Sequence, residues 1–180
     1  MEGDIERILY SREQIDERVK ELAAQVVGVY REKDLTVAVA LTGAFMFAAD
    51  IVRHLVQHVD MVFLRSTSYR DGTTPQHAPE IEIFDKIDWT GRDVLIVEDI
   101  VDTGRTISAL TATIEAAGAR SVRTCAFLDK PARRETDVDV EFVGFKLEVD
   151  EFVVGYGLDF AGRYRNLPYV GILRPEHISD

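Results

Sequence analysis

The sequence predicts an α/β protein with a central, mainly parallel sheet flanked by helices. Apolar runs typical of strands alternate along the chain with segments of helical periodicity, which favours parallel strands connected by helices. The Val-Leu-Ile-Val run at residues 94–97 is continuously apolar, as expected for a central strand buried on both faces. A length of 180 residues suits one substantial core but is short for two, so we expect a single domain over residues 1–180.

The periodicity of apolar residues indicates three helices. The first begins after a capping box formed by Ser11 and Gln14 and ends near Lys33. Its apolar positions recur at helical spacing and are Ile15, Val19, Leu22, Val26 and Val29. The apolar positions of the second helix are Phe47, Ile51, Leu55 and His58. The third helix is expected from about residue 104 to Gly118, because glycine commonly ends a helix.

The remaining regular segments are expected to be strands. We expect them at residues 35–41, 59–67, 80–85, 94–97, 121–128, 142–145 and 152–154. The segment at residues 68–75 is polar and contains glycine and proline, which indicates a loop. Its length makes this loop a candidate lid.

Composition and charge exclude several classes of protein. A net charge of −11 and a pI near 4.8 disfavour a nucleic-acid-binding surface, which would be basic. No run approaches the roughly 20 apolar residues of a membrane span. The opening Met-Glu-Gly-Asp lacks the basic start of a signal peptide, so we expect a cytoplasmic protein without membrane contact. A polyphosphate substrate would require backbone dipoles, a few placed cations or a metal ion to offset the acidic balance.

Cysteine and histidine give no sign of a metal site. The single cysteine, Cys125, lies in an apolar run, where it is expected to be a core residue with a suppressed thiolate. One cysteine also excludes an intrachain disulfide. The four histidines do not have ligand spacing, so a zinc site is not expected.

Residues 94–106 contain the strongest functional signal. An apolar strand there is followed by two acids, Glu98 and Asp99, and then by a third, Asp102, at a turn that opens a helix. Ligands of open α/β sheets bind at this edge of the sheet. Carboxylates repel anions, so Glu98 and Asp99 are suited to sugar hydroxyls or to magnesium, a hard cation that prefers oxygen ligands. Asp102 is then available for proton transfer.

The turn after Asp102 is suited to bind a phosphate. Its backbone N–H groups, with the hydroxyls of Thr103 and Thr106, would enclose the anion at a helix N-terminus. The helix dipole favours an anion there by about 1–2 kcal/mol. Gly104 would permit close approach of the backbone to the ligand.

Other interpretations of this segment compete with a phosphate site. Adjacent acids at a strand end can be solvated loop residues, with Thr103 as a simple helix cap, although the full pattern over residues 94–106 disfavours this. Residues 102–104, Asp-Thr-Gly, also match the aspartic-protease signature. That fold is all-β, whereas this tripeptide opens a helix. Neither a P-loop nor a Gly-x-Gly-x-x-Gly motif is present.

At these residues the sequence resembles the type I phosphoribosyltransferases, and residues 94–106 are similar to their signature for phosphoribosyl pyrophosphate (PRPP). The resemblance implies a core at about 35–128, a small hood from 1–34 and 129–180, and a flexible loop. Further segments resemble the hypoxanthine-guanine branch of the family, within about residues 35–173. They are residues 41–47, 66–69, 127–131, 142–145 and 150–159.

The resemblance implies roles for the residues that match these motifs. PRPP and its 5-phosphate would be bound by Glu98, Asp99, Asp102, Thr103, Gly104, Arg105 and Thr106. Its pyrophosphate would contact Thr42, Gly43 and Arg165. The Mg²⁺ cofactor would be bound by Glu98, Asp99 and Asp150. The closing loop would contain Ser68 and Tyr69.

For the purine, the resemblance implies contacts with Lys130, Phe142, Val143 and Asp150. Lys130 would contact the exocyclic oxygen, Phe142 would stack on the ring, and Val143 would meet the base edge through main-chain atoms. Asp102 would accept the proton from N7 as N9 attacks the anomeric carbon. An aromatic residue in a short strand is also commonly a core residue, which is the alternative for Phe142.

The implied activity is purine salvage, in which PRPP and hypoxanthine or guanine give IMP or GMP and pyrophosphate. The alternatives are a regulator with this fold that binds nucleotide or RNA without turnover, and an enzyme for xanthine or adenine. Two departures from the family pattern stand out. Thr42 occupies a position usually held by lysine or arginine, and one extra residue precedes Asp150. The family commonly forms dimers or tetramers, so a homodimer or homotetramer is expected.

Overall fold

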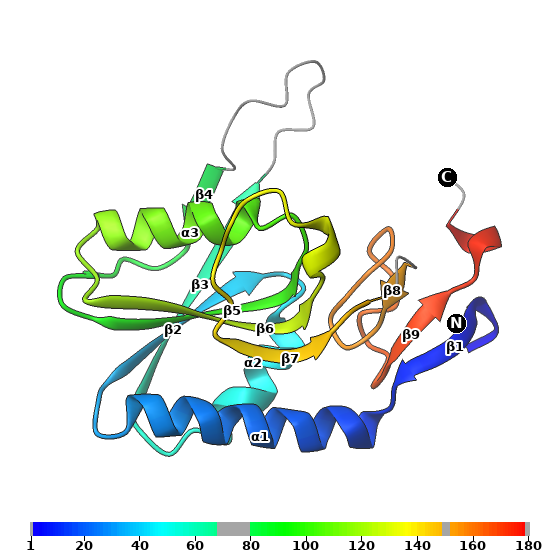
Figure 1. Cartoon of the computed structure of the whole chain (residues 1–180), viewed down its shortest axis with the longest axis horizontal. Helices are drawn as coiled ribbons and strands as arrows, with labels where there is room; N and C mark the ends of the chain where they lie inside the picture. Colours follow the sequence, from blue (N-terminus) through cyan, green and yellow to red (C-terminus); the bar gives the residue numbers. More distant parts are fainter. Residues whose placement is uncertain (1, 68–79, 149–151, 179–180) are drawn as a thin grey trace.

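The computed structural model describes residues 2–67, 80–148 and 152–178 (Figure 1). Its main sheet has the strand order β4-β3-β2-β5-β6-β7. The strands are β2 (Leu35–Leu41), β3 (Val59–Thr67), β4 (Glu80–Ile83), β5 (Asp93–Val101), β6 (Ser121–Asp129) and β7 (Phe142–Lys146). All neighbours pair in parallel except β3 and β4, which are antiparallel. The mainly parallel sheet predicted from the alternating pattern is confirmed.

Helices cover both faces of this sheet. The helices α1 (Arg12–Tyr30) and α2 (Phe45–Val52) lie on one face, and α3 (Arg105–Ala116) lies on the other (Figure 1). Side chains of β5 point alternately to the two cores, so that Leu95 belongs to the α1 and α2 side and Ile96 to the α3 side. Both side chains are fully buried, which explains why residues 94–97 are apolar without alternation.

The helix boundaries partly match the sequence periodicity. At the start of α1, the Gln14 N–H donates to Ser11 Oγ at 3.3 Å and the Ser11 N–H donates to Gln14 Oε1 at 2.8 Å, which confirms the capping box. The second helix is shorter than expected, because α2 ends at Val52 rather than near His58. The His58 carbonyl instead accepts a hydrogen bond from the Leu35 N–H at 3.3 Å, so the chain is already entering the sheet.

A second, three-stranded sheet joins the two ends of the chain. Its order is β1-β9-β8, with β1 (Ile5–Tyr10), β9 (Val170–Leu173) and β8 (Val153–Val154) all antiparallel. Short 3-10 turns, η1 (Glu2–Asp4) and η3 (Pro175–His177), flank it. The hood was expected to comprise residues 1–34 and 129–180, and this sheet takes its strands from both ranges. Within those ranges, α1 packs against the main sheet through apolar side chains of its core. The strand β7 belongs to the main sheet because it pairs with β6.

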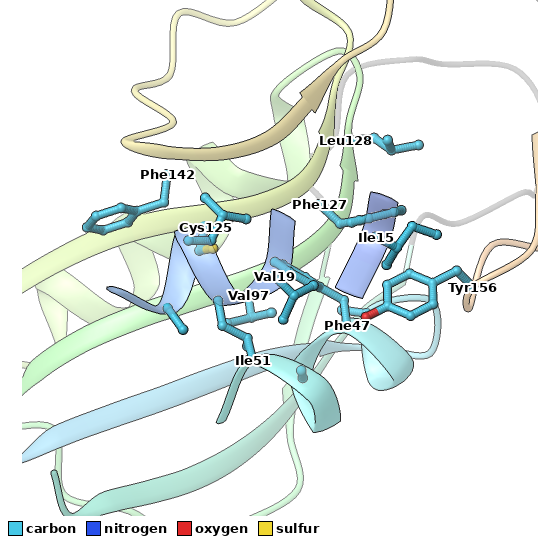
Figure 2. Close-up of a cluster of buried hydrophobic side chains, with 14 of the residues drawn as sticks. Ile15, Val19, Phe47, Ile51, Val97, Cys125, Phe127, Leu128, Phe142 and Tyr156 are labelled. Atoms are coloured by element: carbon cyan, nitrogen blue, oxygen red, sulfur yellow. The ribbon is translucent and has the colours of Figure 1, made fainter. Parts of the chain in front are cut away.

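The larger core cluster lies between the main sheet and the helices α1 and α2 (Figure 2). Phe47 and Phe127 pack there with ring centroids 5.5 Å apart. Cys125 is fully buried, and burial raises the pKa of its thiol, which confirms its prediction as a core residue. Across the described ranges, no helix has the length and apolarity that a membrane span requires.

An ion pair anchors the amino end of β5. The Asp93 side chain is almost fully buried and accepts hydrogen bonds from Arg120 Nε at 3.1 Å and from Ser121 Oγ at 2.6 Å. Arg120 Nη2 also contacts this carboxylate. These donors lower the pKa of Asp93 to about 2.

We predict that Asp93→Asn lowers the free energy of unfolding by about 1–3 kcal/mol at neutral pH, because the amide replaces a charge-assisted acceptor. The carboxyl has a lower pKa folded than unfolded, so its stabilisation is complete above about pH 3.9 and is lost as the pH falls toward about 2. Urea unfolding of both proteins at about pH 7 and about pH 2.5 checks this. An equal difference at both pH values would contradict it.

Candidate active site

Three connecting segments meet at the carboxyl edge of the main sheet. They follow β2, β5 and β6, whose parallel pairing brings their carboxyl ends to the same edge. The segments are residues 42–44, 102–104 and 130–141. Ligands of open α/β sheets bind at such an edge, so the site predicted from residues 94–106 lies where the fold favours it.

The acid pair lies near the end of β5. Glu98 is buried, and its burial together with the neighbouring Asp99 charge raises its pKa well above the usual range. Glu98 Oε1 accepts a hydrogen bond from the Asp99 N–H at 3.2 Å, and Asp99 Oδ1 accepts one from the Ile100 N–H at 2.9 Å. A cation or hydroxyl donors beside this pair would favour its charged form.

The turn at residues 102–104 opens α3 in the way the sequence predicts. Gly104 is the N-cap residue with φ +84°, in the left-handed region, and as a glycine it supplies no capping side chain. A Cβ at this position would lie 2.7 Å from the Thr136 carbonyl oxygen. The Arg105 N–H donates to Thr103 Oγ1 at 3.4 Å, whereas Gly104 offers no side-chain acceptor to the other first N–H groups of α3, an arrangement suited to an anion.

The loop after β2 is packed directly against the acid pair. Its Leu41–Thr42 peptide bond is cis. A Cβ on Gly43 would lie 1.6 Å from Asp99 Oδ2, and a Cβ on Gly157 would lie 2.1 Å from the Gly43 carbonyl oxygen. A side chain at Gly157 would clash with backbone, and one at Gly43 would push the Asp99 carboxylate aside. These contacts bring the loops after β2 and β8 to the end of β5.

Arg165 is held beside this contact. Its Nη1 donates to the Gly157 carbonyl at 2.6 Å, and its Nη2 pairs with Asp159 Oδ1 at 2.7 Å. Gly157 therefore lies between Arg165 and Gly43 and contacts both. Arg165 and the residue 42–43 loop, which were predicted to bind pyrophosphate, lie in the same region.

A cavity of about 260 Å³ opens beside the turn. It is lined by Asp99, Ile100, Asp102, Lys130, Arg133, Leu147, Phe152, Val153, Leu158 and Asp159. Lys130 directly follows β6 and is 7% exposed. Asp102 Oδ1 is buried without a hydrogen-bond partner in the described structure, and Arg133 Nε lies 3.4 Å from it. The Phe152 ring is 41% exposed and packs edge-on against Phe160.

The structure does not place Phe142 and Val143, the predicted purine contacts, at the cavity. Phe142 is buried in the core at the start of β7, opposite Cys125, and Figure 2 shows it at the other end of the cluster from Leu128. The carboxyl edge is reached at Lys146, which pairs with Asp129, so Phe142 lies about 13 Å back along the strand. The Val143 carbonyl is occupied by a hydrogen bond from Arg18 Nη2 at 2.7 Å.

The cavity instead contains Phe152, Val153 and Asp159, which the sequence interpretation did not assign to the base. The dipeptide Phe-Val occurs at both 142–143 and 152–153. The direction of β7 distinguishes the two dipeptides. Because β7 runs parallel to β6, its first residues, Phe142 and Val143, lie away from the carboxyl edge and the cavity. Predicted residues Asp150, Ser68 and Tyr69 lie outside the described residues.

The donor set is consistent with magnesium. Within the described ranges, no three His, Cys, Asp or Glu side chains converge on one point. Magnesium in enzymes of phosphate chemistry is usually bound by one or two carboxylates together with substrate oxygens and water, so a closed protein cage is not required. Asp99 and Asp159, which both line the cavity, satisfy this requirement, and Glu98 lies next to Asp99.

Comparison with known proteins agrees with this geometry. A family profile described as a phosphoribosyl transferase domain matches residues 9–161, which include every segment lining the cavity. The chain therefore belongs to the phosphoribosyltransferase family.

Its relatives in that family belong to the hypoxanthine-guanine branch. The chain is 42% identical to the hypoxanthine-guanine phosphoribosyltransferase of Bacillus subtilis, over 97% of each protein. It is 44% identical to the hypoxanthine phosphoribosyltransferase of Haemophilus influenzae, over 91% of this chain and 93% of the relative. The crystal structure of a Staphylococcus aureus hypoxanthine phosphoribosyltransferase superposes with a TM-score of 0.92 at 38% identity, covering 100% of this chain and 97% of that one.

We predict that Gly43→Ala displaces the Asp99 carboxylate and lowers transferase activity by about 100-fold, because a shift of about 1 Å in a reacting group costs this much. Gly28→Ala is the matched control. An added Cβ on Gly28 meets nothing within 4 Å, and the helix should gain about 0.5–1 kcal/mol. Initial rates and calorimetric PRPP titrations measure both variants. Wild-type PRPP affinity and rate in Gly43→Ala would contradict the contact.

Proposed function

We propose that this protein transfers the 5-phosphoribosyl group of PRPP to N9 of hypoxanthine or guanine, which gives IMP or GMP and pyrophosphate. The observation that carries the proposal is the buried Asp102 Oδ1, which has no hydrogen-bond partner in the described structure and lines one cavity with Lys130 and Phe152. A proton donor on a bound purine would supply the missing partner. The family resemblance and the names of the relatives support the same activity.

The base is proposed to bind between Phe152 and Lys130. The exposed Phe152 ring, supported edge-on by Phe160, offers a stacking surface, and Val153 lies beside it for main-chain contacts. The lysine ammonium can only donate hydrogen bonds, so it matches the exocyclic oxygen of hypoxanthine or guanine and not the amino group of adenine. This chemistry favours an oxopurine over adenine. It leaves xanthine as an alternative substrate.

Asp102 is proposed to act as the general base. As N9 forms its bond to the anomeric carbon and the bond from that carbon to pyrophosphate breaks, the N7 proton passes to the Asp102 carboxylate. The 5-phosphate would be bound by the N–H groups at residues 103–106, where Gly104 allows close approach. The residue 42–43 loop and Arg165 would contact the departing pyrophosphate. Gly43 lies against Asp99, and Arg165 contacts Gly157, which packs on Gly43.

Magnesium would be held by Asp99 with Glu98, and by Asp159 in place of the predicted Asp150. When bound, the ion would neutralise the charge of the departing pyrophosphate. The residues of the chain would orient its ligands, since Asp99 is fixed by the Ile100 N–H and Asp159 by Arg165. Basic side chains at the site, including Lys130, Arg133 and Arg165, would offset the net charge of −11 locally.

A cytoplasmic homodimer or homotetramer is part of the same proposal, as the family resemblance implies. Val56 and Met61, which are exposed apolar side chains in and before β3, would contribute to such an interface. Sedimentation analysis of the full chain would measure the oligomeric state.

The direct test of the activity combines the protein, magnesium, PRPP and one base. IMP should form from hypoxanthine and GMP from guanine, with adenine much slower. A regulator that binds nucleotides without turnover would form no IMP. Rates with xanthine would separate a xanthine enzyme from a hypoxanthine-guanine enzyme.

We predict that Asp102→Asn retains IMP binding but lowers the single-turnover rate of IMP formation by about 100- to 10,000-fold, because the amide cannot accept the N7 proton. The exposed Asp139 lies outside the cavity, so Asp139→Asn serves as the matched control and should react at the wild-type rate. Calorimetry with IMP and rapid-quench assays would measure both variants. An undiminished rate in Asp102→Asn would remove Asp102 from its role.

The two Phe-Val positions give a paired prediction. Phe152→Leu should raise the Michaelis constant for hypoxanthine about 2- to 10-fold, since aromatic stacking contributes about 0.5–1.5 kcal/mol. Phe142→Leu should lower Tm without changing that constant, because Phe142 is a core residue. Steady-state kinetics and thermal unfolding of both variants would measure this. The reverse pattern would restore Phe142 as the purine contact.

A further inference from the structure

Residues 131–138 pack against the turn at residues 102–104, the phosphate turn of the proposed site. They begin with the 3-10 turn η2 (Pro131–Arg133), directly after Lys130. The Glu135 and Thr136 N–H groups both donate to the Thr103 carbonyl at 3.0 Å, and the Glu135 carboxylate pairs with Arg105 at 2.6 Å. Two backbone donors of the segment thus satisfy the Thr103 carbonyl and hold the segment against the turn.

Arg134 connects this turn to the end of the neighbouring strand. Its Nη1 donates to the Asp102 carbonyl at 3.0 Å, and its Nη2 pairs with the Asp129 carboxylate. The Arg134 side chain is 18% exposed and that of Asp129 is 10% exposed, so the contact is largely removed from water. Charge-assisted contacts of a planar guanidinium are directional, and they fix both acceptors relative to each other.

The connection lies where the strand ladder ends. The last backbone bond between the β5 and β6 segments joins the Lys130 N–H to the Val101 carbonyl at 2.9 Å. Arg134 adds a second link beside this bond, from the carbonyl of Asp102, which follows Val101, to the carboxylate of Asp129, which precedes Lys130. Each acceptor adjoins a residue with a role in the proposed reaction. Asp129 precedes Lys130, which would bind the base, and Asp102 precedes residues 103–106, which would bind the phosphate.

We infer that Arg134 is a positioning residue that sets the base-binding loop against the phosphate turn. The inference rests on the proposed function, in which the purine binds to Lys130 and the sugar phosphate to residues 102–106. The two substrates then meet on separate loops, and N9 must lie about 3–3.5 Å from the anomeric carbon for reaction. A change in the relative position of the loops would leave each binding surface intact but misalign the reacting atoms.

The test compares Arg134→Lys and Arg134→Gln with wild type in single-turnover IMP formation, together with Michaelis constants for PRPP and hypoxanthine. A lysine keeps the charge but cannot span both acceptors. Both variants should lower the single-turnover rate by about 10- to 100-fold, with each Michaelis constant changed less than about threefold. An unchanged rate in a folded variant, or an effect confined to the Michaelis constant for PRPP, would overturn the inference.

Arg92→Gln is the matched control for a purely structural arginine. Arg92 also bridges a carbonyl and a carboxylate, with Nε donating to the Asp88 carbonyl and Nη1 to Asp60 Oδ2, both at 2.6 Å. It lies at the amino edge of the main sheet, so its loss should lower Tm and leave the rate unchanged. A rate loss in Arg92→Gln equal to that in Arg134→Gln would overturn the positioning role.

If Arg134→Gln does not fold, Asp129→Asn tests the same link from its other end and should lower the rate in the same direction. An undiminished rate in folded Asp129→Asn would also overturn the inference. The wild-type assay distinguishes a failure of the proposed function from a failure of the Arg134 role. A wild-type protein that forms no IMP contradicts the proposed function, whereas an active wild type with fully active Arg134 variants contradicts only the role of Arg134.

Discussion

The burial of β5 on both faces is the constraint on which the site depends. Side chains of this strand fill the core on the α1 and α2 side and the core on the α3 side, so the strand cannot shift without exposing one of them. Its direction delivers Glu98 and Asp99 to the carboxyl edge and places the turn at 102–104 at the start of α3. The chemistry of the site is therefore fixed in space by apolar packing several residues away.

Much of this arrangement could be predicted because it is local in sequence. Residues 94–106 contain the strand, the acids, the turn and the helix start within one continuous segment. The hood strands β1 and β9 were missed because their pairing partners are far apart in the chain, as in the pairing of Ile5 with Leu173. No local sequence pattern indicates such a pairing, because it forms only when the two ends of the chain meet.

The purine contacts show a second limit of sequence interpretation. Two Phe-Val dipeptides, at 142–143 and 152–153, have the same local chemistry, and composition does not distinguish them. The pairing of β7 with β6 does, because it sends Phe142 into the core and leaves Phe152 half-exposed in the cavity. The role of a residue here follows from the edge of the sheet it reaches, a property of strand direction rather than of side-chain type.

Two neighbouring arginines after β6 contact different parts of Asp102. Arg134 is mostly buried and donates to the Asp102 carbonyl, whereas Arg133 is mostly exposed and lies 3.4 Å from the Asp102 carboxylate. A buried guanidinium with two acceptors constrains the backbone, and an exposed one mainly supplies positive charge that solvent screens. The main chain of Asp102 is thus fixed while its side chain keeps an oxygen without a hydrogen-bond partner in the described structure. In the proposed reaction Asp102 takes up a proton, and a rigid backbone with a buried carboxylate oxygen near Arg133 suits that role.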